Sequence, residues 1–180
     1  YEELGERLMI GNVLFFLGHA AYRREDWSEA TDLLEKAAPI FQDFHEYRNL
    51  YLSYSLQSLT SFSSENFEKA KGYCKKIVDF YIESEGSLEY VNAYGLLGHI
   101  AYQEKDWDKA KSHLLKALDL SIEHKIYNAH IISGIELLWH QLHDEDLLMQ
   151  VANILGESPE NLREKWGTST PNDITPSTSK

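Results

Sequence analysis

Apolar side chains recur along the chain at helical spacing, in stripes that short polar segments interrupt. One stripe runs through residues 94–102, and after the polar segment EKDW a second stripe begins at Ala110 and continues through Leu114 and Leu118. Apolar positions three or four residues apart indicate a helix with one buried face. Asp106 lies at the break and is a typical N-cap residue. The pattern therefore predicts two antiparallel helices joined by a turn.

This pair of stripes is repeated along the chain. The segment LGHAAYRREDW at residues 17–27 returns as LGHIAYQEKDW at residues 97–107, eighty positions later. A weaker copy lies halfway, where Phe67 stands in place of the tryptophan and Ala70 in place of the alanine that follows it. Self-similarity at a fixed period is the signature of a repeat architecture. The sequence thus predicts helix pairs that recur with a period of about 40 residues.

Small residues are expected to bring the two helices of each pair close together. Gly18 and Gly98 on the first helices have no side chain, and Ala30 and Ala110 are expected to supply the matching small surface on the second helices. The tryptophan at each turn is expected to fill the corner between the helices. Pro39 lies inside the second helix of the first unit and predicts a kink or an early end there.

These patterns predict an all-α fold, a right-handed solenoid of about four antiparallel helix pairs with a C-terminal capping helix. The fourth pair lacks the signature because Leu138 stands where the other units have glycine, and it is expected to pack differently. The repeat domain is expected over residues 11–166. Its expected parts are a lead-in or the end of a preceding helix at 1–10, units near 11–50, 51–90, 91–125 and 126–156, a capping helix at 158–166 and a flexible tail at 167–180.

The composition argues against several functional classes. Lys and Arg number 17 against 29 Asp and Glu, a formal charge of −12. Such a surface repels phosphate backbones, so we expect a neutral or basic partner and no direct contact with nucleic acid. No apolar run reaches the roughly 20 residues of a membrane span. With Cys74 as its single cysteine the chain cannot form an internal disulfide, which favours a reducing, cytoplasmic location.

Motifs of catalysis and of cofactor binding are missing from the sequence. It contains no Gly-rich phosphate loop, HExxH or GxSxG, so we expect neither an enzyme nor a cofactor. His140, His143 and Asp144 could offer metal ligands on adjacent turns, but this spacing is common and nothing else supports a metal site. Cys74 replaces a leucine of the motif and is expected to be a buried, inert thiol.

The concave face of a solenoid, lined by its first helices, is where binding usually occurs. The candidate binding residues on this face are Asn12, Phe15, His19, Arg23, Leu59, Phe62, Asn92, His99, Gln103 and Trp139. Asparagine and histidine recur there at equivalent positions. An asparagine amide both donates and accepts, so it can pair with an extended peptide backbone, while the aromatic residues could form pockets for apolar side chains. The alternatives are that common ancestry preserved the repeated residues and that the aromatic residues pack in the core.

The order of Leu-Gly, Tyr, Ala, Leu and Ala, clear in the first and third units and weak in the second, resembles the tetratricopeptide repeat over residues 11 to about 122. That repeat is usually shorter, at about 34 residues, so the extra length is expected to extend the second helix. Repeats of this longer period also resemble the sensor repeats of Gram-positive peptide-pheromone regulators, in which a groove binds a short secreted peptide and asparagine commonly holds its backbone. The resemblance implies a non-catalytic scaffold that binds a peptide or an extended protein segment, as the sensor or interaction part of a larger regulatory protein. The alternative is an assembly module that forms a homodimer or docks a neighbouring domain.

Overall fold

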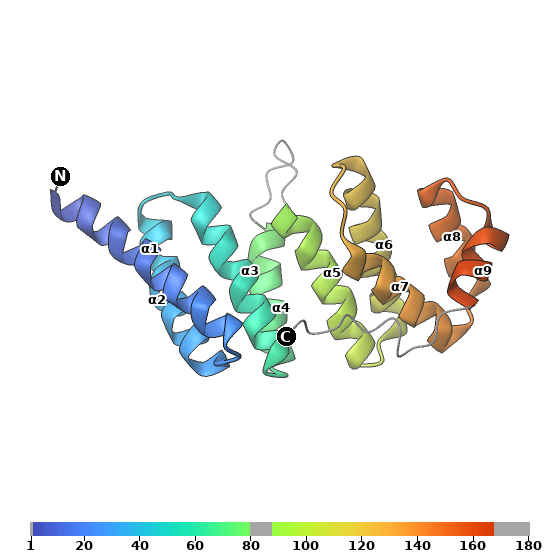
Figure 1. Ribbon diagram of the computed structural model, residues 1–180, viewed down its shortest axis with the longest axis horizontal. Helices are drawn as coiled ribbons and strands as arrows, with labels where there is room; N and C mark the ends of the chain where they lie inside the picture. Colours follow the sequence, from blue (N-terminus) through green and yellow to red (C-terminus); the bar gives the residue numbers. More distant parts are fainter. Residues whose placement is uncertain (1, 80–87, 168–180) are drawn as a thin grey trace. The chain divides into compact units, whose positions relative to one another are not determined.

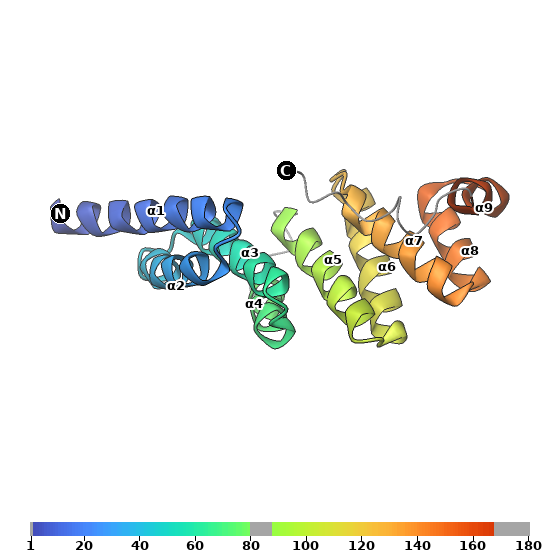
Figure 2. The same ribbon diagram turned by 60° about the horizontal axis from the view of Figure 1, so that its bottom comes forward.

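The computed structural model describes residues 2–79 and 88–167, and within these ranges the chain is helical apart from short turns (Figure 1). The helices of these ranges are α1 (Glu2–Arg23), α2 (Trp27–Asp43), α3 (Tyr47–Ser63), α4 (Phe67–Asp79), α5 (Leu88–Gln103), α6 (Trp107–Glu123), α7 (Ala129–Leu142), α8 (Glu145–Leu155) and α9 (Pro159–Gly167). Consecutive helices pack as pairs, α1 along α2, α3 along α4 and α5 along α6 (Figures 1 and 2). The predicted all-α fold of helix pairs is confirmed.

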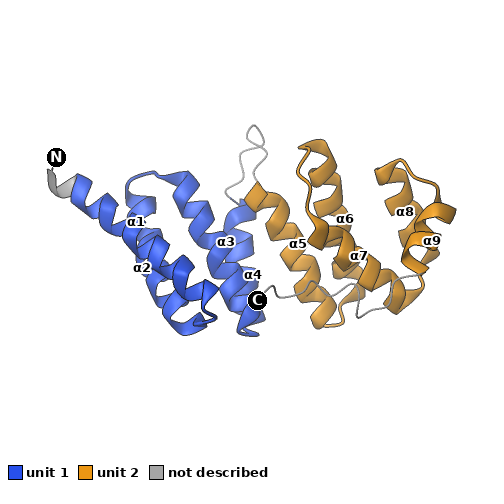
Figure 3. Cartoon of the chain, in the orientation of Figure 1, with its two compact units in different colours: residues 1–85 blue, residues 86–180 orange. Residues whose placement is uncertain are grey.

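The chain forms two compact units, residues 1–85 and 86–180 (Figure 3). The first contains α1 to α4, and the second contains α5 to α9. A continuous repeat domain over residues 11–166 stays a prediction. The assignment of residues 1–10 to a lead-in or to the end of a preceding helix also stays a prediction, and α1 runs without a break from Glu2 to Arg23. The tail prediction falls, from residue 168 onward, outside the described residues.

The repeat period is made of two segments of equal length, each a helix followed by a short turn. Helices α2, α3 and α6 have 17 residues each, and three-residue turns follow α1, α2, α3 and α5. The middle residue of each turn has a left-handed backbone, with φ of 63° at Glu25, 57° at His45, 59° at Glu65 and 61° at Lys105. This conformation ends a helix by turning the next amide back onto free carbonyls. Both helices therefore contribute equally to the repeat period. The extra length expected in the second helix alone is not found.

An aspartate side chain starts α6, as predicted, and another starts α2. The Asp106 carboxylate accepts a hydrogen bond from the Lys109 amide at 3.3 Å, and Asp26 accepts one from the Glu29 amide at 3.1 Å. Each bond satisfies one of the amides that have no partner inside the first helical turn.

The early end expected at Pro39 is wrong. Helix α2 continues to Asp43 because the residues after the proline are held by packing. Phe41 is fully buried, and Ile40 lies so close to Gly11 of α1 that a Cβ on that glycine would meet it at 2.9 Å. Burial of this last turn outweighs the one backbone hydrogen bond that proline cannot make.

The glycines permit the close approach of paired helices, as predicted, but the residue opposite each of them is leucine. A Cβ at Gly18 would lie 2.8 Å from the Leu34 Cγ, and a Cβ at Gly98 would lie 2.5 Å from the Leu114 Cγ. The leucine side chain therefore fills the space above the glycine. Ala30 and Ala110, the alanines expected to supply the matching small surface, are also fully buried.

Aromatic pairs fill the corner of each pair, which confirms the role predicted for the tryptophans. The ring centroids of Tyr22 and Trp27 lie 5.4 Å apart, and those of Tyr102 and Trp107 lie 5.6 Å apart. The degenerate unit keeps the same contact with two phenylalanines, at 5.7 Å. The corner contact thus survives although the middle copy has lost most of the motif.

The second unit closes differently from a regular repeat. Helix α7 packs more extensively on α6 and α5 than on α8, and Leu138 is fully buried in this core. Helix α9 then covers α8 and contributes the buried residues Leu162 and Trp166. This is the capping helix that the sequence predicts.

Candidate functional site

The first helices of unit 1 are joined through an asparagine pair. The Asn49 Nδ2 on α3 donates to the Asn12 Oδ1 on α1 at 3.4 Å. Both side chains are half-buried. Asn12 therefore lies in the contact between neighbouring helix pairs, with its side-chain oxygen turned toward α3.

The second unit repeats this contact. The Asn128 Nδ2 donates to the Asn92 Oδ1 at 2.6 Å, and the Asn128 Oδ1 caps α7 by accepting from the His130 amide at 3.0 Å. An interaction that links adjacent first helices is thus common to both units. It offers a structural reason for the repeated asparagine, in addition to the ligand binding that the sequence predicts.

The two repeated histidines differ in environment. His19 is exposed on α1, whereas His99 lies against α7, where its Nε2 is 3.2 Å from the His130 carbonyl oxygen. Gly134 allows this approach, because a Cβ there would meet the His99 ring at 2.8 Å. Burial lowers the pKa of His99, so its ring stays neutral at physiological pH. Among the two, His19 is the one open to a ligand.

The remaining candidates of unit 1 divide into exposed and packed residues. Arg23 is exposed on α1, and Leu59, exposed on α3, occupies the position equivalent to His19 one period later. Phe62 belongs to the aromatic corner with Phe67, and Phe15 makes an edge contact with Phe41 of α2 at 6.3 Å. Phe15 and Phe62 are therefore half-buried packing residues. In unit 2, Gln103 is exposed at the end of α5.

Trp139 is not a residue of an open face, contrary to the sequence prediction. It is 7% exposed, and its ring lies 5.7 Å from that of Trp166 on α9. The indole Nε1, the His140 Nε2 and the Glu136 Oε1 are buried without a hydrogen-bond partner in the described part of the chain. The sequence does not predict this group of polar atoms on α7, because their burial depends on helices from other parts of the chain.

An open hollow, which the sequence does not predict, lies in unit 1 at the start of α2. It is lined by Arg24, Glu25, Asp26, Trp27, Ser28, Thr31, Asp32 and Ser64. Arg24 is bound to Glu29 at 2.6 Å, and the other charges of the lining are carboxylates. The hollow thus shares the acidic character of the whole chain.

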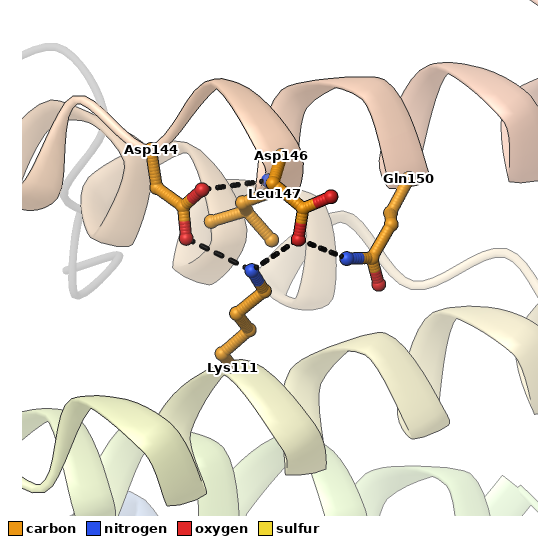
Figure 4. A network of polar contacts seen from close by, with 5 residues as sticks. All are labelled: Lys111, Asp144, Asp146, Leu147 and Gln150. Carbon is orange, nitrogen blue, oxygen red and sulfur yellow. Dashed lines mark hydrogen bonds and ion pairs between the residues drawn. The ribbon is translucent and has the colours of Figure 1, made fainter.

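Lys111 connects α6 to the beginning of α8 (Figure 4). Its Nζ lies 2.9 Å from the Asp144 Oδ2 and 3.0 Å from the Asp146 Oδ2, while the Asp144 Oδ1 accepts from the Leu147 amide at 3.0 Å. Both Asp144 oxygens are therefore used within the fold, which removes Asp144 from the metal site considered with His140 and His143. The described residues contain no group of three or more His, Cys, Asp or Glu side chains that could hold a metal ion.

We expect Asp144→Ala to lower the free energy of unfolding by about 1–2 kcal/mol at pH 7, because the N-cap and the ion pair are lost together. Asp144→Asn keeps a capping oxygen and should cost less than about 1 kcal/mol. The hydrogen bond from Lys111 holds the pKa of Asp144 below its ordinary value. Its contribution is therefore complete above about pH 4 and is lost as the pH falls through the folded-state pKa. Denaturant titrations at pH 7 and pH 3 measure both effects.

Equal losses for the alanine and asparagine variants would contradict the capping role of Asp144. A difference between wild type and Asp144→Ala that stays unchanged down to pH 3 would contradict the contribution of the charge.

Cys74 is buried, and its burial raises the pKa of the thiol to about 12. The thiol is thus protonated at physiological pH and unsuited to act as a nucleophile or a redox group. Among residues 2–79 and 88–167, no helix combines the length and the apolar character needed to span a membrane.

Comparison with known proteins supports a tetratricopeptide-like repeat. No family model matches the chain. A curated relative, tetratricopeptide repeat protein 29 of Macaca fascicularis, is 25% identical over 122 residues, which cover 68% of this chain and 26% of that protein. The chain thus spans about a quarter of the length of the relative that it matches. Together with the helix pairs, this similarity fits a tetratricopeptide-like fold.

Proposed function

We propose that the chain is a non-catalytic helical-repeat scaffold that binds a peptide or an extended protein segment on the first helices of unit 1. The observation that carries this proposal is the pair His19 and Leu59. They occupy equivalent positions on α1 and α3, one period apart, and both are exposed, whereas the equivalent His99 of unit 2 is covered by α7. Neighbouring helices thus offer a polar and an apolar contact at the same level.

The chemistry of this face suits an extended backbone. The Asn12 oxygen is engaged with Asn49, and its amide group remains a donor for a peptide carbonyl. Arg23 could receive a carboxylate, while Leu59 could contact an apolar side chain. The net charge of −12 favours a segment that is neutral or basic overall. In its more specific form, the proposal is that the chain senses a peptide as part of a larger regulatory protein.

The test uses peptides captured by the immobilised chain from cell lysate or spent growth medium and identified by mass spectrometry. Calorimetric titration of a synthetic copy should give roughly thirtyfold weaker binding for His19→Ala/Leu59→Ala than for wild type, since each of the two lost contacts contributes about 1 kcal/mol. These residues are preferable to Asn12, because Asn12→Ala would also disturb the link between α1 and α3.

The matched control is Ile122→Ala, which removes an exposed aliphatic side chain from α6 in the other unit. It should bind the peptide as wild type does. Thermal melts should coincide for all variants. Unchanged affinity of the double variant, or equal weakening by the control, would contradict binding at this face.

The assembly alternative needs an exposed apolar surface and not a polar one. A single observation favours it, the apolar residues that α1 leaves uncovered.

A further inference from the structure

Helix α1 exposes a contiguous apolar stripe. Its members follow one another at helical spacing and are each 51–68% exposed: Met9, Ile10, Val13, Phe16 and Leu17. Isolated apolar side chains are normal on a protein surface, but a continuous group of large ones usually marks an interaction site. We call these five residues the α1 stripe.

The positions of α3 that are equivalent to the α1 stripe form a packing surface. Moving forward by one repeat period takes the stripe from α1 to α3, which packs on α2. There the equivalents of Ile10, Val13, Phe16 and Leu17 are Leu50, Ser53, Leu56 and Gln57, all at most 7% exposed. On α3 these four positions are therefore covered by packing against neighbouring helices. On α1 the described part of unit 1 supplies no such helix.

The α1 stripe is complementary to itself when reversed. About Val13 as the centre, Met9 mirrors Leu17 and Ile10 mirrors Phe16. One pair of opposite charges flanks the stripe, because exposed Glu6 precedes it and exposed Arg23 follows it, whereas Arg7 and Arg24 are bound within the chain by Asp43 and Glu29. In an antiparallel arrangement Glu6 of each copy therefore comes near Arg23 of the other, which is the self-complementarity that a two-fold symmetric interface requires.

We propose that the α1 stripe is the homodimer interface of this chain, with two α1 helices packed antiparallel about a two-fold axis at Val13. Burial of ten apolar side chains supplies the association energy. The arrangement also allows a chain of net negative charge to associate with its own copy. The two copies meet at large apolar residues, so the contact itself brings no carboxylates together. The inference shares Arg23 with the proposed peptide site but uses neither His19 nor Leu59, so the variants that test peptide binding leave the α1 stripe intact.

The first test is sedimentation velocity over concentrations from about 1 to 200 µM, where mass action populates a dimer of moderate affinity. We expect wild type to approach twice the monomer mass. Val13→Glu should weaken dimerisation at least tenfold, because it places two carboxylates face to face on the axis. Ile122→Glu, which charges an exposed position of α6, is the matched control and should dimerise as wild type does.

The second test determines the orientation by disulfide cross-linking. Val13→Cys should cross-link with its own copy, and Met9→Cys should cross-link with Leu17→Cys in a mixture but not with itself. Buried Cys74 leaves the introduced thiols as the reactive ones. Ile122→Cys measures the background of random collision.

A wild-type chain that stays monomeric throughout would overturn the proposal and would assign the stripe to a different partner or chain segment. Self-cross-linking of Met9→Cys as efficient as that of Val13→Cys would overturn the antiparallel arrangement. Equal loss of dimer in Val13→Glu and Ile122→Glu would place the interface away from α1.

Discussion

Gly98→Ala is expected to lower the free energy of unfolding by about 2–3 kcal/mol, although alanine is the better helix former. The added Cβ would lie 2.5 Å from the Leu114 Cγ, 2.9 Å from its Cδ2 and 3.2 Å from its backbone nitrogen. A shift of the side chain alone cannot relieve the last contact, so α5 and α6 must separate. Guanidinium titration followed by circular dichroism measures the loss.

Unit 1 provides a pair of matched variants. Gly18→Ala brings a Cβ to 2.8 Å from the Leu34 Cγ and should also destabilise, whereas Gly72→Ala in α4 meets nothing within 4 Å. The Gly72 variant should stabilise by up to about 1 kcal/mol, the usual gain of alanine over glycine in a helix. If all three variants were more stable than wild type, helix propensity and not close packing would determine the effect of these substitutions.

Features that depend on nearby residues could be predicted from the sequence. The N-cap at Asp106, the Tyr102–Trp107 corner and the Gly98 contact each involve residues that lie close together along the chain. The first repeat carries its own copy of them, so a motif seen twice indicates the local structure. The helix pairs and the capping helix followed from such signals.

The burial of the candidate site could not be predicted in the same way. Trp139 is covered by Trp166, and His99 is covered where Gly134 removes a side chain from α7. Each of these contacts joins residues from different repeats. The fourth repeat lacks the sequence motif that would align its residues with those of the other repeats. Periodicity places a side chain on a helix face but does not say which later helix covers that face.

The α1 stripe shows the converse case, in which residues that the sequence pattern would place in the core are exposed. Val13 and Phe16 fit the apolar pattern of an ordinary core helix, and the sequence offers no sign that they differ from buried residues. Only the structure shows that they are exposed while their equivalents on α3, Ser53 and Leu56, are buried. Exposure at a position that the repeat normally buries is the information that points to a partner.

Trp166→Ala is expected to lower the free energy of unfolding by about 3–5 kcal/mol, the usual cost of removing a buried tryptophan side chain. Trp166 is 4% exposed and holds α9 against the core through its contact with Trp139. Without it, α9 should detach and Trp139 should become accessible to water. Urea unfolding gives the loss of stability, and a red shift of tryptophan fluorescence reports the new exposure of Trp139.

Two further variants separate the capping role of α9 from the loss of any tryptophan. Trp166→Phe retains an aromatic ring over Trp139 and should cost less than half as much, because most of the buried apolar contact remains. Glu164→Ala changes an exposed position of the same helix and should alter stability by less than about 0.5 kcal/mol. A loss below about 1 kcal/mol for Trp166→Ala would mean that the second unit is stable without α9. Its last apolar layer would then be closed by α7 and α8 alone, and the term capping helix would have to be abandoned.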